Sequence, residues 1–130
     1  MSDTTTAPAA ADAATQAALE RLNTVIDRLI APDGCPWDST QTPESLTEYV
    51  IEECHELVDA IRSGKTADMV EELGDVAFLI LMIGKLMARA GGPSLADALE
   101  VEAAKMVRRH PHVFSDTTYE NQSEQLKDWD

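Results

Sequence analysis

The chain has 130 residues, of which 5% are aromatic and 44% hydrophobic, and its formal net charge at pH 7 is −14. This length suits one domain, and the abundance of Ala, Leu, Met and Glu favours helices over a strand-rich sandwich or barrel. The negative charge argues against binding of a nucleic-acid polymer or an anionic membrane surface, because both require a basic protein surface.

The N-terminal segment, residues 1–13, is of low complexity and is predicted to be disordered. A helix is expected from about residue 15 to residue 30, where apolar residues recur at helical spacing. These residues are Leu19, Leu22, Ile26 and Leu29. Residues 31–43 contain three prolines and one glycine, so this segment is predicted to form a structured loop.

The second helix is predicted to begin with Thr42 as N-cap and Pro43 at its first position, and to end near Arg62 before Gly64. Its apolar residues form one stripe that we expect to face the core. They are Leu46, Val50, Cys54, Leu57 and Ile61.

The third helix is predicted over residues 67–90 and is apolar on nearly every face from Val76 onward. A small monomer could hardly cover such a helix, so we expect a homo-oligomer, either a dimer or a tetramer. A fourth helix is expected to begin at Ser94, with Asp97 as its capping-box partner, and to end near Arg109. The predicted fold is all-α: an antiparallel bundle of four to five helices in one domain, residues 14–130, completed by oligomerisation.

The two cysteines provide no disulfide framework, and no apolar run reaches the about 18 residues that span a bilayer. The N-terminus has no basic region followed by an apolar stretch, which is the pattern of a secretory signal. We therefore expect a cytoplasmic protein.

Ten of the 24 acidic residues fall between Glu44 and Asp75. Glu53 and Glu56 are three residues apart on the flank of the second helix's apolar stripe, whereas Glu52 points nearly opposite the core. Glu72 and Asp75 repeat this spacing on the third helix. Acidic runs on helices are usually solvated faces, but two such pairs on adjacent helices would repel one another unless a cation neutralised them. Carboxylate oxygens favour Mg²⁺, with Mn²⁺ as the alternative.

Two further groups of residues are candidates for substrate binding. Lys105, Arg108 and Arg109 either offset the dipole at the end of the fourth helix or hold a phosphate chain. Trp37 either closes one end of the bundle, which its loop position favours, or stacks on a nucleobase, with Asp38 beside it.

Several blocks of the sequence resemble one known family. Glu52-Glu53-x-x-Glu56, followed after 15 residues by Glu72-x-x-Asp75, is similar to the signature of the MazG-type all-α nucleoside triphosphate pyrophosphohydrolases. The segments APDGCPWDSTQTPESL, EELGD and KMVRRHPHVFSD resemble further MazG blocks in the same order. The resemblance covers about residues 15–130.

The resemblance implies Mg²⁺-dependent hydrolysis of an NTP or dNTP to the nucleoside monophosphate and pyrophosphate. By the same resemblance, the metal ligands are Glu53, Glu56, Glu72 and Asp75. The catalytic candidates are Glu52, which would orient or deprotonate the attacking water, and Glu53. The substrate-binding candidates are Trp37, Asp38, Lys105, Arg108 and Arg109. Two alternatives remain open at this point: a catalytically weak or inactive nucleotide-binding regulatory module, and a purely structural oligomerisation domain.

Overall fold

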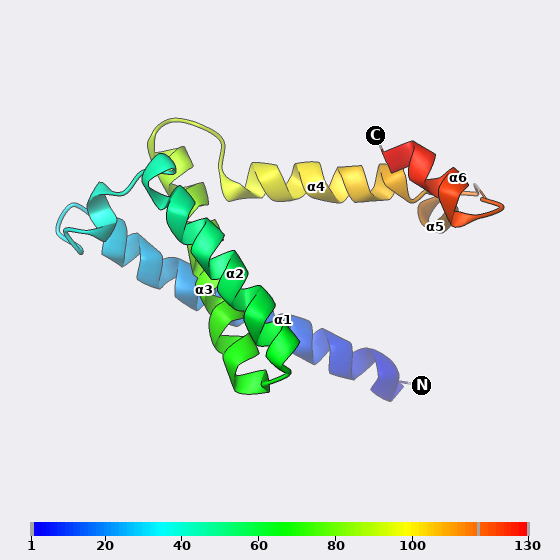
Figure 1. Cartoon of the computed structure of the whole chain (residues 1–130), viewed down its shortest axis with the longest axis horizontal. Coiled ribbons are helices and arrows are strands. Elements are labelled where there is room, and N and C mark those ends of the chain that lie inside the picture. Colours follow the sequence, from blue (N-terminus) through cyan, green and yellow to red (C-terminus); the bar gives the residue numbers. More distant parts are fainter. Residues whose placement is uncertain (1, 117, 130) are drawn as a thin grey trace. The chain divides into compact units, whose positions relative to one another are not determined.

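The structure is a computed structural model that describes residues 2–116 and 118–129, and within these residues it contains helices and no strand. The α-helices are α1 (Ser2–Ile30), α2 (Thr47–Ser63), α3 (Thr66–Arg89), α4 (Leu95–Arg109), α5 (Pro111–Phe114) and α6 (Gln122–Leu126). Two 3₁₀ turns, η1 (Asp38–Thr40) and η2 (Glu44–Leu46), lie between α1 and α2, and a third, η3 (Lys127–Trp129), follows α6. The predicted all-α class is therefore confirmed (Figure 1).

The chain forms two compact units, Met1–Gly92 and Pro93–Asp130, where the sequence predicts one domain over residues 14–130. The physical reason lies in α4, none of whose side chains is fully buried. A helix without buried side chains does not extend a hydrophobic core from one part of the chain to the next. The first unit holds α1, α2 and α3, and the second holds the remaining helices.

The N-terminal segment differs from its prediction, because α1 already begins at Ser2 instead of following a disordered segment over residues 1–13. Met1 lies outside the described residues. The many alanines of this segment supply intrinsic helix propensity. Every side chain from residue 9 to residue 20 is nevertheless exposed, so this stretch of α1 gains no core packing. Its packed half contains Ile26, which is fully buried.

Residues 31–43, here called the tryptophan loop, join α1 to the start of α2 and are structured, as predicted. At the end of the loop the Thr42 hydroxyl accepts from the Ser45 amide at 3.1 Å, and the Ser45 hydroxyl accepts from the Thr42 amide at 2.8 Å. Thr42 thus forms a reciprocal hydrogen-bonded pair with Ser45 ahead of η2, but it is not the N-cap of α2 as predicted, because that position is Leu46. The helical segment begins with η2, and regular α-helix begins at Thr47.

Helices α2 and α3 pack side by side as an antiparallel hairpin, and α1 packs on α3 (Figure 1). Gly64 makes the hairpin turn possible, because its φ of 72° lies in the left-handed region that residues with a side chain rarely adopt. The core that these helices share is small. Its buried apolar residues are Ile26, Leu46, Ala60, Leu79, Leu81, Met82 and Leu86.

The inward face of α2 is rotated from the predicted stripe. Cys54 and Ile61, which were expected in the core, are exposed, whereas Ala60 is buried and Glu53 is half-buried. The reason is that α2 has apolar residues on two faces, and α3 covers one of them. Periodicity alone does not decide which of two apolar faces a partner helix will cover.

In the second unit, Ser94 and Asp97 form the predicted capping box at the start of α4, which ends at Arg109 as predicted. None of the helices in the described part of the chain is both long enough and apolar enough to cross a membrane.

Candidate metal centre

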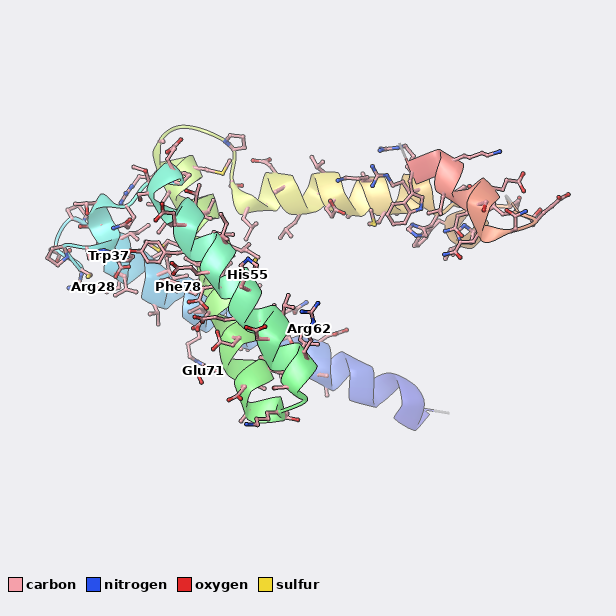
Figure 2. All side chains as sticks on the ribbon, in the orientation of Figure 1. Arg28, Trp37, His55, Arg62, Glu71 and Phe78 are labelled. Atoms are coloured by element: carbon pink, nitrogen blue, oxygen red, sulfur yellow. The ribbon has the colours of Figure 1, made fainter. Side chains whose placement is uncertain are left out.

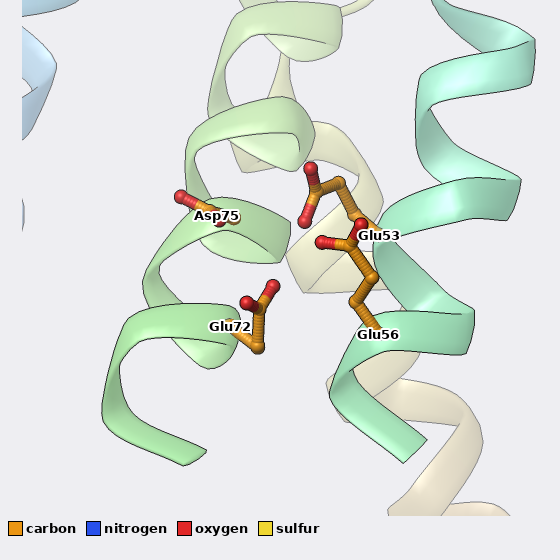
Figure 3. A group of neighbouring side chains, drawn as sticks. All are labelled: Glu53, Glu56, Glu72 and Asp75. Carbon is orange, nitrogen blue, oxygen red and sulfur yellow. The ribbon is translucent and has the colours of Figure 1, made fainter. Parts of the chain in front are cut away.

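Four carboxylates from the α2–α3 hairpin lie close together: those of Glu53, Glu56 and Glu72 lie between the two helices, and Asp75 lies beside them on α3 (Figure 3). Glu53 and Glu56 lie one turn apart on α2, and Glu72 and Asp75 lie one turn apart on α3. Residues three apart on a helix share a face. Because the hairpin is antiparallel, it places the two pairs at the same height, and the sequence prediction that these four residues meet is confirmed.

The spacing of these four side chains suits a divalent cation. Each offers a carboxylate oxygen, and the four oxygens all lie within 4.8 Å of one another. Around Mg²⁺, ligand oxygens lie at about 2.1 Å from the metal, so oxygens on opposite sides are about 4.2 Å apart. A small inward movement of flexible glutamate side chains is enough to reach that distance.

The electrostatics of the group favour a bound cation. Burial raises the pKa of Glu53, and the charges of Glu56 and Asp75 raise it further. Burial also raises the pKa of Glu72, to about 7, and a hydrogen bond and the charge repulsion with Glu56 contribute to the shift. Both shifts show that the negative form of these carboxylates is disfavoured where they stand, which is the condition that a cation relieves.

Two oxygens of the group point to the same conclusion. Glu53 Oε2 and Glu72 Oε2 are buried and have no hydrogen-bond partner. A buried acceptor without a partner costs free energy, so such atoms are rare in folded proteins. A set of hard carboxylate oxygens fits Mg²⁺ or Mn²⁺ better than zinc or copper, which prefer nitrogen and sulfur ligands. The residues present therefore fit the implied metal.

The group lies between two pockets, and two of its carboxylates line each of them. The first pocket, of about 300 Å³, is acidic and is lined by Glu56, Asp59, Ala60, Ser63, Asp68 and Glu72. The second, of about 240 Å³, is aromatic and is lined by Trp37, Tyr49, Glu53, Asp75, Phe78 and Leu79. A ligand in the aromatic pocket would therefore lie directly beside the carboxylates.

Trp37 lies in this second pocket instead of closing the bundle, which sequence reasoning favoured. Its side chain is 47% exposed, and its ring stands edge-on to Tyr49, with 5.7 Å between the ring centroids. Figure 2 places Trp37 and Phe78 on the same side of the hairpin. Tyr49 and Phe78 were missed as site residues. Tyr49 stands four residues before Glu53 and Phe78 three residues after Asp75, and this spacing could have identified both.

The remaining candidates of the first unit do not join the carboxylates. Glu52 is exposed and lies outside the group of four, as helix geometry predicts. Asp38, in η1, is buried and is not among the residues that line the aromatic pocket.

The three basic candidates belong to the second unit. Lys105 pairs with Glu102 on α4 at 2.9 Å. The guanidinium of Arg109 lies 5.4 Å from the centre of the Trp129 ring, and its Nε is buried without a hydrogen-bond partner. Arg108 is exposed in the last turn of α4. Two of the three cations, Lys105 and Arg109, therefore already have interaction partners within the second unit.

Comparison with known families gives one match that covers more than half of the chain. Residues 41–114 match the model of the MazG nucleotide pyrophosphohydrolase domain. All four carboxylates of the hairpin fall in the matched range, as do Lys105, Arg108 and Arg109.

Curated relatives agree with this match. The chain is 41% identical over 98 residues to the nucleoside triphosphate pyrophosphohydrolase/pyrophosphatase MazG of Thermotoga maritima, covering 75% of this chain and 38% of that protein. It is 38% identical over 113 residues to the nucleoside triphosphate pyrophosphohydrolase of Escherichia coli K12, covering 86% and 43%. It is 42% identical over 106 residues to the uncharacterized protein YabN of Bacillus subtilis, covering 82% and 22%. The chain thus spans less than half the length of these relatives.

A solved structure shares the fold. The crystal structure of a mazG-related protein from Thermotoga maritima superposes with a TM-score of 0.69 and 29% sequence identity. The superposition covers 85% of this chain and 94% of that one.

Proposed function

Because the chain belongs to the MazG nucleotide pyrophosphohydrolase domain family, we propose that it hydrolyses NTPs or dNTPs to the nucleoside monophosphate and pyrophosphate. The observation that carries this proposal is the group of four carboxylates with two unpartnered buried oxygens beside an aromatic pocket. The proposal includes a cytoplasmic location, since nucleoside triphosphates are found in the cytoplasm.

In this proposal Glu53, Glu56, Glu72 and Asp75 hold Mg²⁺, or Mn²⁺ in its place. The bound metal would neutralise the phosphoryl oxygens and acidify the attacking water. Glu53, whose pKa is raised, is a half-buried ligand and one of the two catalytic candidates. Glu52, the other candidate, orients or deprotonates the water, and its exposed position on α2 requires the substrate or a second chain to enclose it.

The rest of the substrate is assigned by chemistry. The nucleobase enters the aromatic pocket, where Trp37 offers a half-exposed ring for stacking and Asp38 follows it in the chain. Lys105, Arg108 and Arg109 hold the phosphates and stabilise the pyrophosphate leaving group. Their cationic side chains suit a substrate that carries several negative charges.

We also propose that the protein is a homo-oligomer. Helix α3 exposes four large apolar residues that follow a heptad spacing: Val70, Leu73, Ile80 and Met87. The outer face of α2 exposes Ile51, Val58 and Ile61, again at spacings of three and seven. Two exposed seams on one hairpin fit a second copy of the same hairpin, which would complete a four-helix bundle.

The proposal is tested by incubating the protein with a panel of NTPs and dNTPs in the presence of Mg²⁺ and measuring both products. Equal amounts of monophosphate and pyrophosphate are expected from at least one substrate. Glu71→Gln is a matched control, because this exposed acid precedes Glu72 and is not one of the four carboxylates. No product from any substrate, with folded protein, would refute the hydrolase.

One observation favours a second candidate, a nucleotide-binding regulatory module without turnover. Lys105 and Arg109 already have partners, Glu102 and Trp129, within the second unit. Calorimetry separates the two functions. Tight Mg²⁺-dependent nucleotide binding without product formation would support the module, and product formation would exclude it.

A further inference from the structure

Arg89, in the last turn of α3, joins three parts of the first unit. Its Nη1 donates to the carbonyl of Ile30, the last residue of α1, at 3.0 Å. Its Nη2 donates to the carbonyls of Ser39 and Gln41, in the tryptophan loop, at 3.1 and 3.4 Å. The planar guanidinium has donors on both nitrogens of its fork, so one side chain can bind carbonyls on different segments, which an ammonium does less well.

The tryptophan loop has its own internal hydrogen bonds, and these define its shape. The Thr40 hydroxyl and the Gln41 side-chain amide both donate to the Trp37 carbonyl at 3.0 Å. Near the start of the loop, the ideal Cβ position at Gly34 lies 2.3 Å from the Arg28 carbonyl oxygen, so only glycine fits this turn. Bonds within a loop leave its orientation on the hairpin open, and contacts with other elements must determine it.

Lys85, one turn before Arg89, reinforces the same attachment. It forms an ion pair with Asp27 of α1, and its side chain is only 18% exposed. The last turns of α3 therefore bind the end of α1 through Lys85 and Arg89, and Arg89 alone of the two continues to the loop. The backbone of η1, which directly follows Trp37, and that of Gln41 after it are thus tied to α3.

We propose that Arg89 is a positioning residue for the nucleobase, because it holds the tryptophan loop so that Trp37 lines the pocket beside Glu53 and Asp75. This inference rests on the proposed function. Arg89 itself is not among the residues that line that pocket, and it does not belong to the group of four carboxylates. It acts through Trp37, so its loss should weaken substrate binding while the cleavage of the phosphoanhydride bond is preserved.

The kinetic test compares Arg89→Ala, Trp37→Ala and the double variant. We expect Arg89→Ala to raise KM about tenfold with kcat within about twofold, the pattern of lost uniform binding. In the double variant KM should equal that of Trp37→Ala alone, because residues that act through one another are not additive. Arg89→Lys should give an intermediate KM. If Arg89→Ala does not fold, the KM of Arg89→Lys tests the proposal instead.

Arg28→Ala is the matched control. The Arg28 side chain also contacts the tryptophan loop (Figure 2), but through Asp33 near its start, in a pair at 3.4 Å whose side chains are both exposed, so its loss should leave KM unchanged. An unchanged KM in both Arg89 variants, or additive effects in the double variant, would overturn the proposal.

A second readout needs no substrate. Trp37 and Trp129 are the two tryptophans, so a Trp129→Phe background reports Trp37 fluorescence alone. Releasing the loop by Arg89→Ala or Arg89→Lys should shift the Trp37 emission to longer wavelength, and Arg28→Ala should not. Should the wild-type protein hydrolyse no nucleotide, the proposed function fails, whereas the fluorescence still tests the attachment. An unchanged emission in folded Arg89 variants would refute it.

Discussion

Glu53 and Glu72 approach one another across the α2–α3 hairpin, and each carries a buried Oε2 without a hydrogen-bond partner (Figure 3). Their pKa values are both raised, that of Glu72 to about 7, first by burial and then by neighbouring carboxylates. The folded chain thus keeps together charges that repel one another. Because these carboxylates repel one another in the folded chain, the protein should respond to divalent metal, to pH and to substitution of the acids by uncharged residues.

Substitution of a proposed ligand should abolish turnover and preserve the fold. Glu53→Gln and Asp75→Asn keep the side-chain shape but remove a charge from the group of four. We expect kcat to fall by about 10²-fold or more, the size of effect seen when one preorganised electrostatic partner is removed. Circular dichroism should show unchanged helicity, and Glu71→Gln should retain full activity. Wild-type kcat in either ligand variant would contradict the ligand assignment.

Divalent metal should stabilise the protein. A cation that binds only the folded chain adds about 2.7 kcal/mol at a concentration of 100 times its Kd. Thermal unfolding with and without Mg²⁺ measures this as a rise in Tm, and Glu53→Gln should reduce the rise. Equal Tm values for the wild-type protein at all Mg²⁺ concentrations would argue against a metal centre.

The pH dependence of the metal-free protein follows from Glu72. Its pKa is about 7 in the folded chain, against an ordinary value of 4.5, so the folded state binds this proton more tightly than the unfolded state. Stability from this group is therefore present below about pH 4.5, is lost as pH rises through about 7, and does not change further above. Glu72→Gln should remove this loss, and its Tm advantage over the wild type should grow with pH across the interval. A constant difference would contradict the raised pKa. In the wild type, bound Mg²⁺ should displace the proton of Glu72 and thereby abolish this loss of stability with rising pH.

The aromatic pocket should govern substrate affinity. Stacking of a base on an aromatic ring contributes about 1–3 kcal/mol, so Trp37→Ala should raise KM by about tenfold or more. Trp37→Phe retains a ring and serves as the control with a smaller effect. A KM that is insensitive to Trp37→Ala would place the base elsewhere.

The exposed seam of α3 should support the oligomer. Ile80 is 50% exposed in the single chain, and Ile80→Glu would place a charge in the proposed helix interface. Light scattering should give a multiple of the 14.2 kDa chain mass for the wild type and for Ile80→Val, and a smaller mass for Ile80→Glu. A wild-type protein that is monomeric at all concentrations would refute the oligomer.

Local signals in the sequence predicted the helices well. Ser94 and Gly64 act where they were expected to act, since caps and left-handed glycines depend on a few neighbouring residues. The segment before residue 14 was harder to predict. Propensity and core packing disagree there, because its alanines favour helix while the side chains of residues 9–13 are all exposed.

The sequence by itself determined that four acidic residues lie in two pairs, each pair on one helix face, because three-residue spacing on an α-helix has only one geometric consequence. Which face of α2 would turn inward was decided by the tertiary structure, which left Cys54 and Ile61 exposed and drew Glu53 toward α3. The same packing brought Trp37, from a distant loop, beside Glu53 and Asp75. Contacts between segments far apart in the chain depend on how whole helices pack, and no local pattern contains that information.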